Sequence, residues 1–371
     1  MRKTKTMFKI ILLSSILFTC LFLLFCILNQ EKKTFKLHSD ASFYMIRYDG
    51  IDSYQVKGSY VEKLANQNKE IIKGQINQVI HRAELNRRYL VFSEEGPPLG
   101  KVGRIISIDF QKGTIGYLKT LDYAYTSSGS SASYYFTSEA SPTSSFLAAF
   151  DTQLKQMAKI EFPEPIIAGD FLVDDEEIYL LGTDIEGEDF FPTNLYHLSL
   201  SNKTLTIVNA EAVDEDPQVN TLFTDSLVRK KQLYVLSPGY RVKSSNNQVA
   251  LGRILHMNLE SGQKEWLDLP QIAPINIYDL GKDLLAIEHE KNEAGTLGIS
   301  LFNLDSKESK FIDLTQFGLS PDEDSLKDVK RLNDDTILIL VGKKLLAYRL
   351  SDGQILFEES VKETAFHICV P

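Results

Sequence analysis

A short strand–turn–strand phrase recurs along this chain. It is clearest at residues 253–269, where an apolar strand runs to Leu259, a turn follows at residues 260–263 (ESGQ), and a second strand begins at Lys264. The same order returns at residues 195–208. Self-similarity of this kind restricts the architecture to repeat folds before any single residue is considered.

The phrase can be followed through most of the chain. The strands before its turns end at residues 48, 110, 150, 200, 259, 304 and 350. The turns are rich in Gly, Asn, Asp and Ser, which tolerate the positive φ angles of tight hairpins. The strands are apolar at nearly every position, which indicates burial on both faces of the sheet.

Each phrase is preceded by two further strand-like segments. Before the phrase at 253–269 these are residues 232–237 and 220–224. Four short antiparallel strands per unit are typical of a propeller blade, so we predict an all-β fold, a β-propeller. We expect residues 365–370 to close the ring as the innermost strand of the blade that contains Phe43–Tyr48, which gives seven blades. Six blades are the alternative, because the unit at 133–162 shows no clear inner strand.

Two stretches support a resemblance to known propellers: LYVLSP…RILHMNLESGQKEWLDL and ILILVGKKLLAYRLSDGQILFEES. On the strength of these stretches, the chain resembles extracytoplasmic seven-bladed propellers of the broad YVTN and quinoprotein-like class. The resemblance extends over about residues 35–370. The resemblance implies the architecture and no particular family. The Trp-Asp signature of intracellular propellers is absent, since Trp266 is followed by Leu267. The repeated docking motif of quinoprotein dehydrogenases is absent too.

Residues 10–28 form an uncharged apolar run. At about 1.5 Å per residue, a helix of this length spans about 28 Å, close to the hydrocarbon core of a bilayer. The run is long for a signal peptide and lacks a small-residue cleavage site, so we expect an uncleaved anchor, with a cleaved signal as the alternative. The predicted order is a cytoplasmic tail (1–9), a transmembrane anchor (10–28), a linker (29–36) and a propeller ectodomain (37–371). This predicts a single-pass cell-membrane protein whose C-terminal domain is extracytoplasmic.

Charge and cysteine content narrow the partners. The chain has 40 basic and 50 acidic residues, and its first residues are strongly basic, so the predicted ectodomain is more acidic than the net charge of −10 implies. Such a domain is unsuited to nucleic acid, whose phosphates require basic side chains. Only Cys369 lies outside the apolar run. An extracytoplasmic domain of this size without a disulfide suits a bacterial surface.

Four polar residues are candidates for a site in the central channel. His81, Arg82, Asp170 and His367 all fall on or beside predicted innermost strands. Polar side chains around such a channel can bind a ligand or perform acid–base chemistry. The alternative is a water-filled channel without a ligand. No nucleotide-binding, metalloprotease or serine-hydrolase motif appears in the chain.

Residues 123–136 combine Tyr with Ser and Gly, as adaptable recognition surfaces do. We interpret this segment as a long loop, and its binding candidates are Tyr123, Tyr125, Tyr134 and Tyr135. The alternative is a connecting loop whose tyrosines pack locally.

A weak calcium candidate combines Asp184, Glu186 and Glu188, which alternate as calcium-loop ligands do, but no downstream bidentate Glu follows. We therefore predict no cofactor. His197 and His256 hold the same place in two repeats and are expected to be half-buried structural residues.

The leading hypothesis is a non-catalytic binding or scaffolding module at a bacterial cell surface, with a protein or an envelope polymer as its partner. The alternative is a hydrolase or lyase that uses the polar central channel.

Overall fold

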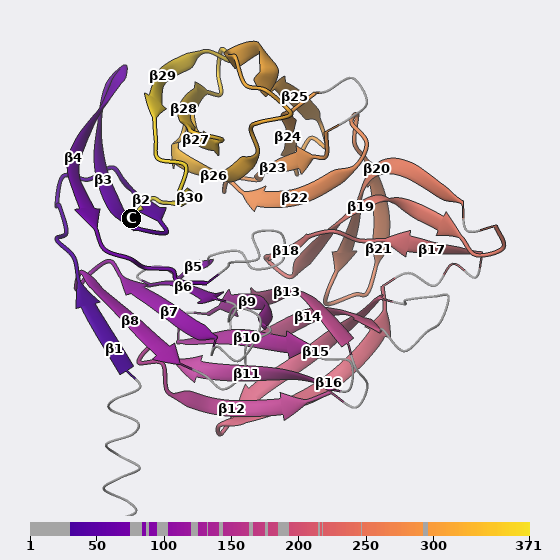
Figure 1. Cartoon of the computed structure of the whole chain (residues 1–371). Coiled ribbons are helices and arrows are strands. Elements are labelled where there is room, and N and C mark those ends of the chain that lie inside the picture. Colours follow the sequence, from indigo (N-terminus) through magenta and orange to yellow (C-terminus); the bar gives the residue numbers. More distant parts are fainter. Residues whose placement is uncertain are drawn as a thin grey trace, which may run out of the picture.

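The computed structural model describes residues 30–74, 84–86, 89–94, 103–119, 125–131, 133–140, 144–162, 166–174, 177–184, 193–213, 216, 218–245, 247–291 and 296–371. They form the strands β1 to β30 and one short 3-10 helix, η1 (Leu314–Phe317). The strands build seven antiparallel sheets that are arranged in a ring (Figure 1). The chain is therefore an all-β, seven-bladed propeller, as predicted.

We number the blades in chain order and give the innermost strand of each first. Blade 1 consists of β30 (Ala365–Cys369), β2 (Phe43–Arg47), β3 (Gly50–Lys57) and β4 (Tyr60–Asn68). Blade 2 consists of β5 (Glu84–Asn86), β6 (Tyr89–Glu94), β7 (Arg104–Asp109) and β8 (Thr114–Lys119). Blade 3 consists of β9 (Tyr125–Ser130), β10 (Tyr134–Ala140), β11 (Ser145–Asp151) and β12 (Gln156–Glu161). Blades 4 and 5 consist of β13 (Ile166–Asp174), β14 (Glu177–Asp184), β15 (Thr193–Ser201) and β16 (Thr204–Ala212); and β18 (Ser226–Arg229), β19 (Gln232–Val242), β20 (Gln248–Asn258) and β21 (Lys264–Asp268). Blades 6 and 7 consist of β22 (Pro274–Asp279), β23 (Leu284–His289), β24 (Gly298–Asn303) and β25 (Ser309–Asp313); and β26 (Leu326–Asn333), β27 (Thr336–Val341), β28 (Lys344–Arg349) and β29 (Ile355–Ser360).

Blades 2 and 5 each carry one extra strand. β1 (Gln30–Thr34) pairs with the outermost strand of blade 2, β8. β17 (Val219–Leu222) pairs with the far half of β19 in blade 5.

The hydrophobic core lies between the blades. Among the described residues, the buried apolar side chains form seven clusters, and each cluster joins two neighbouring blades. Strand β27 illustrates why a strand between two blades is apolar at every position. Ile337 and Ile339 pack toward blade 6, whereas Leu338 and Leu340 pack toward blade 1. Alternate side chains point to opposite faces, so a strand with a neighbour on each face needs apolar residues at successive positions.

The C-terminal strand β30 pairs with β2 in blade 1, which confirms the predicted closure. β30 pairs with β2 from Tyr44–Cys369 to Arg47–Ala365. The innermost strand of this blade therefore comes from the C-terminal end of the chain and its other three strands from the N-terminal part. This arrangement closes the ring by joining the two parts of the chain within one blade.

Two details of the strand assignment differ from expectation. The segment Phe43–Tyr48 contains the second strand of its blade, β2, so the counterpart of the repeating phrase in blade 1 is β3, with its turn at Gly58. The inner strand that seemed absent from blade 3 is β9. It was hidden because its sequence, YTSSGS, is polar and was read as part of a loop.

The N-terminal anchor lies outside the described residues, so residues 10–28 as a transmembrane segment stay a prediction. In the part of the chain that the structure describes, no helix is long and apolar enough to cross a membrane. Within residues 29–36, which we expected to be a linker, Gln30–Thr34 form the strand β1.

The antiparallel strands give the ring two distinct ends. Connections from second to third strands and from blade to blade lie at one end, which we call the loop end. Tight turns between first and second and between third and fourth strands lie at the other, which we call the turn end. Residues 314–325 join β25 to β26 at the loop end, whereas residues 35–42 join β1 to β2 at the turn end.

Candidate functional site

A buried polar residue recurs at one position of the innermost strands. His367 lies opposite Ile46, Asp328 opposite Leu340, and Asn276 opposite Glu288 in the strand pairings. Asp225 holds the corresponding place in blade 5, where its carbonyl accepts a hydrogen bond from Leu236. All four side chains that share this position are buried: Asp225, Asn276, Asp328 and His367.

These residues join one inner strand to the next. The Asp225 carboxylate accepts a 2.7 Å hydrogen bond from the backbone N–H of Ile277 in blade 6. The Asp328 carboxylate accepts a 2.8 Å bond from the N–H of Ile368 in blade 1. The shared geometry gives this position a structural role, because each carboxylate satisfies a backbone donor that would otherwise be buried without a partner.

His367 is tied into the same junction. Its Nδ1 lies 2.8 Å from Oδ2 of Asp328. Burial acts to raise the pKa of Asp328, but Lys330, His367 and the Ile368 N–H outweigh it and lower that pKa to about 2. Asp328 is therefore ionised at neutral pH and is committed to contacts between blades 7 and 1.

The structure describes only part of the four-residue channel site. His81 and Arg82 lie outside the described residues. Asp170 lies in β13, where the pairing with β14 is irregular between Ala168 and Phe171. In register, Asp170 lies at the same inner-strand position as His367, which is three blades away around the ring. A channel site built from all four residues stays a prediction.

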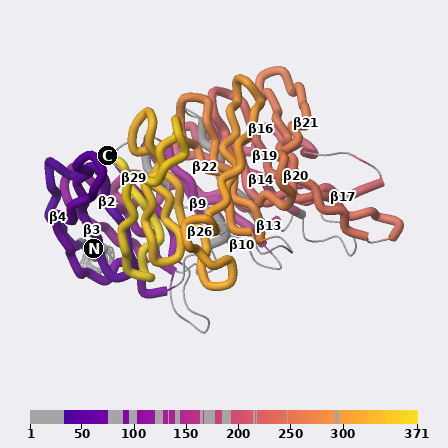
Figure 2. The backbone as a smooth tube through the Cα atoms, turned by 90° about the horizontal axis from the view of Figure 1, so that it is seen from above, coloured from indigo at the N-terminus to yellow at the C-terminus, as the bar shows by residue number. Residues whose placement is uncertain are grey.

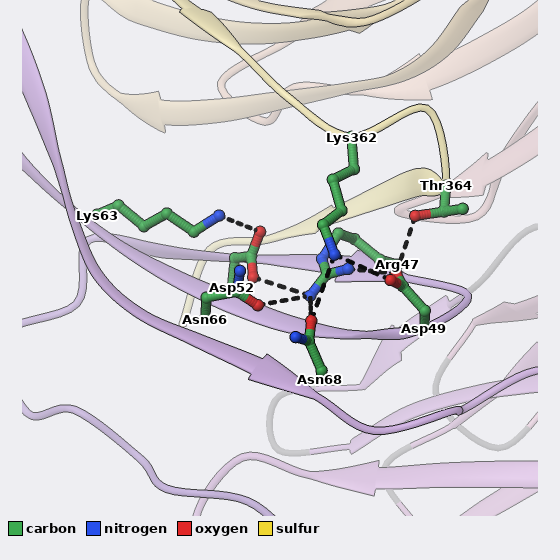
Figure 3. A network of polar contacts seen from close by, with 8 residues as sticks. All are labelled: Arg47, Asp49, Asp52, Lys63, Asn66, Asn68, Lys362 and Thr364. Atoms are coloured by element: carbon green, nitrogen blue, oxygen red, sulfur yellow. Dashed lines mark hydrogen bonds and ion pairs between the residues drawn. The ribbon is translucent and has the colours of Figure 1, made fainter.

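A second polar cluster surrounds Arg47, which is fully buried at the end of β2 (Figure 3). Its guanidinium donates to Asp49 and, at 3.1 Å, to Asp52. The side-chain oxygens of Asn66 and Asn68 on β4 accept further bonds at 3.0 and 3.1 Å. Sequence reasoning missed this residue, although an arginine inside the apolar run FYMIR was a visible signal.

The Arg47 cluster also holds the C-terminal part of the chain. Lys362 and Thr364, in the connection before β30, both bond the Asp49 carboxylate. Lys63 on β4 contacts Asp52 at 2.7 Å. Because these contacts join β2 and β4 to the connection before β30, we assign the cluster to ring closure.

The tyrosine-rich segment is not a loop. It forms the inner strand β9 and the second strand β10 of blade 3. Tyr135 is buried and stacks on Phe150 with ring centroids 5.1 Å apart, and Tyr134 packs against the cluster between blades 3 and 4. Tyr125 lies in β9, and Tyr123 falls outside the described residues. A binding role for these tyrosines stays a prediction.

The calcium candidate is only partly described. Asp184 is the last residue of β14, and Glu186 and Glu188 fall outside the described residues. Within the described ranges, no group of three or more His, Cys, Asp or Glu side chains is placed to hold a metal ion.

Blade 5 carries an extension that sequence reasoning also missed. β19 and β20 continue beyond the blade, and β17 adds to them as a third strand. We call this three-stranded extension, residues 219–222, 239–242 and 248–251, the arm. Figure 2 shows it projecting from the body of the ring. Gly239 lies at the register shift where the arm begins: its φ is 147°, and a Cβ there would meet the carbonyl oxygen of Val249 at 1.9 Å.

The two faces of the arm differ in polarity. Register and strand alternation place six residues on one face: Val219, Thr221, Tyr240, Val242, Val249 and Leu251. All six are half-buried, and none belongs to the clusters between the blades. The opposite face carries Asn220, Arg241 and Gln248, together with Leu222 and Ala250 nearer the ring. Among the described strands, β17 pairs only with β19, so its outer edge has no strand partner.

The arm emerges at the loop end, where the connections are acidic. Residues 213–218, which lead into β17, contain the run Asp214-Glu215-Asp216. Residues 318–325, at the same end of blade 7, contain Asp322, Glu323 and Asp324. This end therefore favours cationic partners over anionic ones.

Comparison with known proteins supports the fold and nothing finer. No protein-family model and no curated protein matches the chain. Among solved structures, a 6-phosphogluconolactonase candidate from Bacteroides uniformis is similar, with a TM-score of 0.56, 11% identity, and coverage of 88% of this chain and 98% of that one. Its counterpart from Bacteroides fragilis has a TM-score of 0.54 and 12% identity, with coverage of 90% and 99%. The dihydro-heme d1 dehydrogenase NirN has a TM-score of 0.54 and 10% identity, with coverage of 90% and 78%. These similarities show a shared propeller architecture.

Proposed function

We propose that this protein is a non-catalytic binding or scaffolding module, held at a bacterial cell membrane by residues 10–28 and recruiting a protein partner through the arm of blade 5. The observation that carries the proposal is the arm itself. It combines an apolar face, a strand edge that no other described strand pairs with, and an adjacent acidic connection.

The position of β1 supports this arrangement. Gln30 pairs with Leu118 near the loop end of β8, and Thr34 pairs with Thr114 beside the turn end. Gln30, the first residue that the structure describes, thus lies near the loop end of blade 2. β1 and the arm lie on opposite sides of the ring (Figure 1). A tether at blade 2 would therefore lie across the ring from the arm, at the same end of the ring.

The chemistry of the arm suggests an extended peptide segment as the bound element. A strand that adds to the free edge of β17 would form backbone hydrogen bonds, as in other cases of β-augmentation. Its apolar side chains would pack on the face of Tyr240 and Val249. Its basic side chains would lie near the acidic run at residues 214–216. The proposed partner is therefore a protein with an extended segment in which basic and apolar residues alternate.

Two synthetic peptides test this recognition on the full chain in detergent. An alternating Lys–Val peptide should bind in fluorescence anisotropy, and an alternating Glu–Val peptide should not. Tyr240→Ser with Val249→Ser should weaken binding at least ten-fold, about 1.4 kcal/mol. Gln248→Ser, on the opposite face of the arm, is the matched control and should leave binding unchanged. Equal binding of both peptides, or no effect of the double variant, would overturn the proposal.

The alternative of a channel hydrolase or lyase has less support. Of its four residues, His367 is the one whose side chain the structure describes, and its contact with Asp328 holds two blades together. We therefore favour the binding module.

A further inference from the structure

Two neighbouring blades contain the same stacked pair of side chains. In blade 4, Tyr179 stacks on His197 with ring centroids 4.9 Å apart. In blade 5, Tyr234 stacks on His256 at 4.8 Å. In both blades the Tyr lies directly opposite the His in the pairing of the second and third strands. The pairs occupy equivalent places and provide an internal comparison.

The pair in blade 5 is closed by polar contacts. His256 Nδ1 lies 2.9 Å from Oε1 of Glu265, which is opposite it on β21. His256 Nε2 lies 2.8 Å from Oε1 of Gln232. Lys307 from blade 6 contacts both oxygens of Glu265 at 3.0 and 2.9 Å. Both ring nitrogens of His256 are therefore occupied.

The pair in blade 4 lacks the carboxylate contact that its counterpart in blade 5 has. The residue opposite His197 on β16 is Asn209, where blade 5 has Glu265. The nearest carboxylate, Oε1 of Glu177, lies 4.0 Å from His197 Nε2, beyond hydrogen-bonding distance. Glu177 itself is engaged by the Lys231 ammonium and by the Tyr179 hydroxyl, and these contacts lower its pKa.

A pocket of about 240 Å³ lies in front of His197, between blades 4 and 5. Its wall includes Leu195 and Leu259, and its polar lining adds Asn209, Glu211 and Glu260. Among the described residues, neither Glu211 nor Glu260 forms an ion pair, and the cation in the lining, Lys231, is paired with Glu177. The pocket thus has an excess of negative charge next to a small apolar wall.

We propose that this pocket is a binding site for a small organic amine. The ammonium group would be held by Glu211 and Glu260, which supply the charge that the pocket leaves unbalanced. The carbon chain would lie against Leu195 and Leu259, and His197 and Asn209 would offer further hydrogen bonds. The lining extends from Glu260 at the turn end to Glu211 near the loop end of β16, and it shares no residue with the arm. The site is therefore distinct from the proposed partner surface.

The test uses 1,4-diaminobutane as the probe, with the full chain in detergent and its histidines labelled with 13C. The chain has six histidines, and His197→Gln and His256→Gln assign the two resonances of interest. We expect saturable movement of the His197 imidazole resonance and none for His256, which serves as an internal reference. Butylamine should bind more weakly because it carries one charge, and succinate should not bind.

Two variants test how residues Asn209 and Glu211 contribute to binding of the amine. Asn209→Glu adds a further carboxylate to the pocket lining and should strengthen binding of the diamine. Glu211→Gln should weaken binding about ten-fold, or about 1.4 kcal/mol. Glu308→Gln, an exposed carboxylate between blades 6 and 7, is the matched control. No saturable response of His197, an equal response from His256, or the same affinity in both variants as in the parent chain would overturn the proposal.

Discussion

The Thr364 hydroxyl donates a 2.9 Å hydrogen bond to the Asp49 carboxylate, although the two residues are 315 positions apart in the chain. Lys362 contacts the other oxygen of Asp49 at 3.0 Å. Burial acts to raise the pKa of Asp49, but Lys362, Thr364 and Arg47 outweigh it and lower that pKa to about 2. The contact therefore fastens the two halves of blade 1 at any pH well above 2.

Removing this carboxylate should loosen the closure of the ring. We expect Asp49→Ala to lower the free energy of unfolding by about 1 kcal/mol, because Asp49 is partly exposed and its contacts are screened by water. Guanidinium denaturation of the full chain in detergent, followed by circular dichroism, measures the change. Asp268→Ala removes an exposed ion pair with Arg253 and should have no measurable effect. Equal losses in the two variants would contradict a special role for Asp49.

Arg47 should matter more than any exposed charge. We expect Arg47→Met to cost about 3–5 kcal/mol, because it leaves the buried Asp52 without its buried cationic partner. The double variant Arg47→Met, Asp52→Leu should recover part of that loss, since no lone charge then stays buried. The denaturation midpoints of the two variants measure these losses of stability. A double variant as unstable as the sum of the single ones would show that the charges are not coupled.

Asp328 should make the ring sensitive to acid. Its pKa is lower in the folded chain than the ordinary value of 3.8, so its contribution to stability is present above pH 3.8 and is lost as the pH falls toward 2. Asp328→Asn should reduce stability by about 1–3 kcal/mol at pH 7 and flatten the pH dependence between 4 and 2. Thermal melts across this range test the expectation. The exposed substitution Asp322→Asn should leave the acid limb of the curve as steep as in the parent chain.

His289 should contribute at higher pH. Its Nδ1 donates to the carbonyl of Ile272 at 3.0 Å, and its Nε2 accepts from the Ser300 hydroxyl at 2.8 Å. Burial lowers the pKa of His289 below its ordinary 6.5, so the folded chain binds this proton more weakly than the unfolded chain. Stability is then fully present above pH 6.5 and declines below it. His289→Gln should reduce the difference in melting temperature between pH 7.5 and pH 5.5, and an unchanged difference would refute this account.

Much of the fold follows from local patterns. The apolar strands and their Gly, Asn and Asp turns predict blades because each strand is covered on both faces and each hairpin needs residues that tolerate positive φ. The pairing of residues 365–369 with β2 was also predictable, since a ring of repeats must close its ends. β9 was not, because the inner strand of a blade can be polar where its neighbours supply the packing.

The candidate sites were harder to predict. His197 and His256 look alike in sequence, and both are half-buried, as expected. What separates them is the residue across the next strand, Asn209 in one blade and Glu265 in the other. The arm of blade 5 was missed because its strands continue those of the blade without a break in the pattern.

The sequence by itself thus determined a closed ring of four-stranded blades, because apolar periodicity and turn chemistry are local properties of the chain. Only the tertiary structure decided which polar residues are committed to holding the ring together and which are left available. That distinction depends on partners from distant positions, such as Thr364 for Asp49 and Asp328 for His367. Contacts of this kind arise when blades meet in space, so no local pattern encodes them.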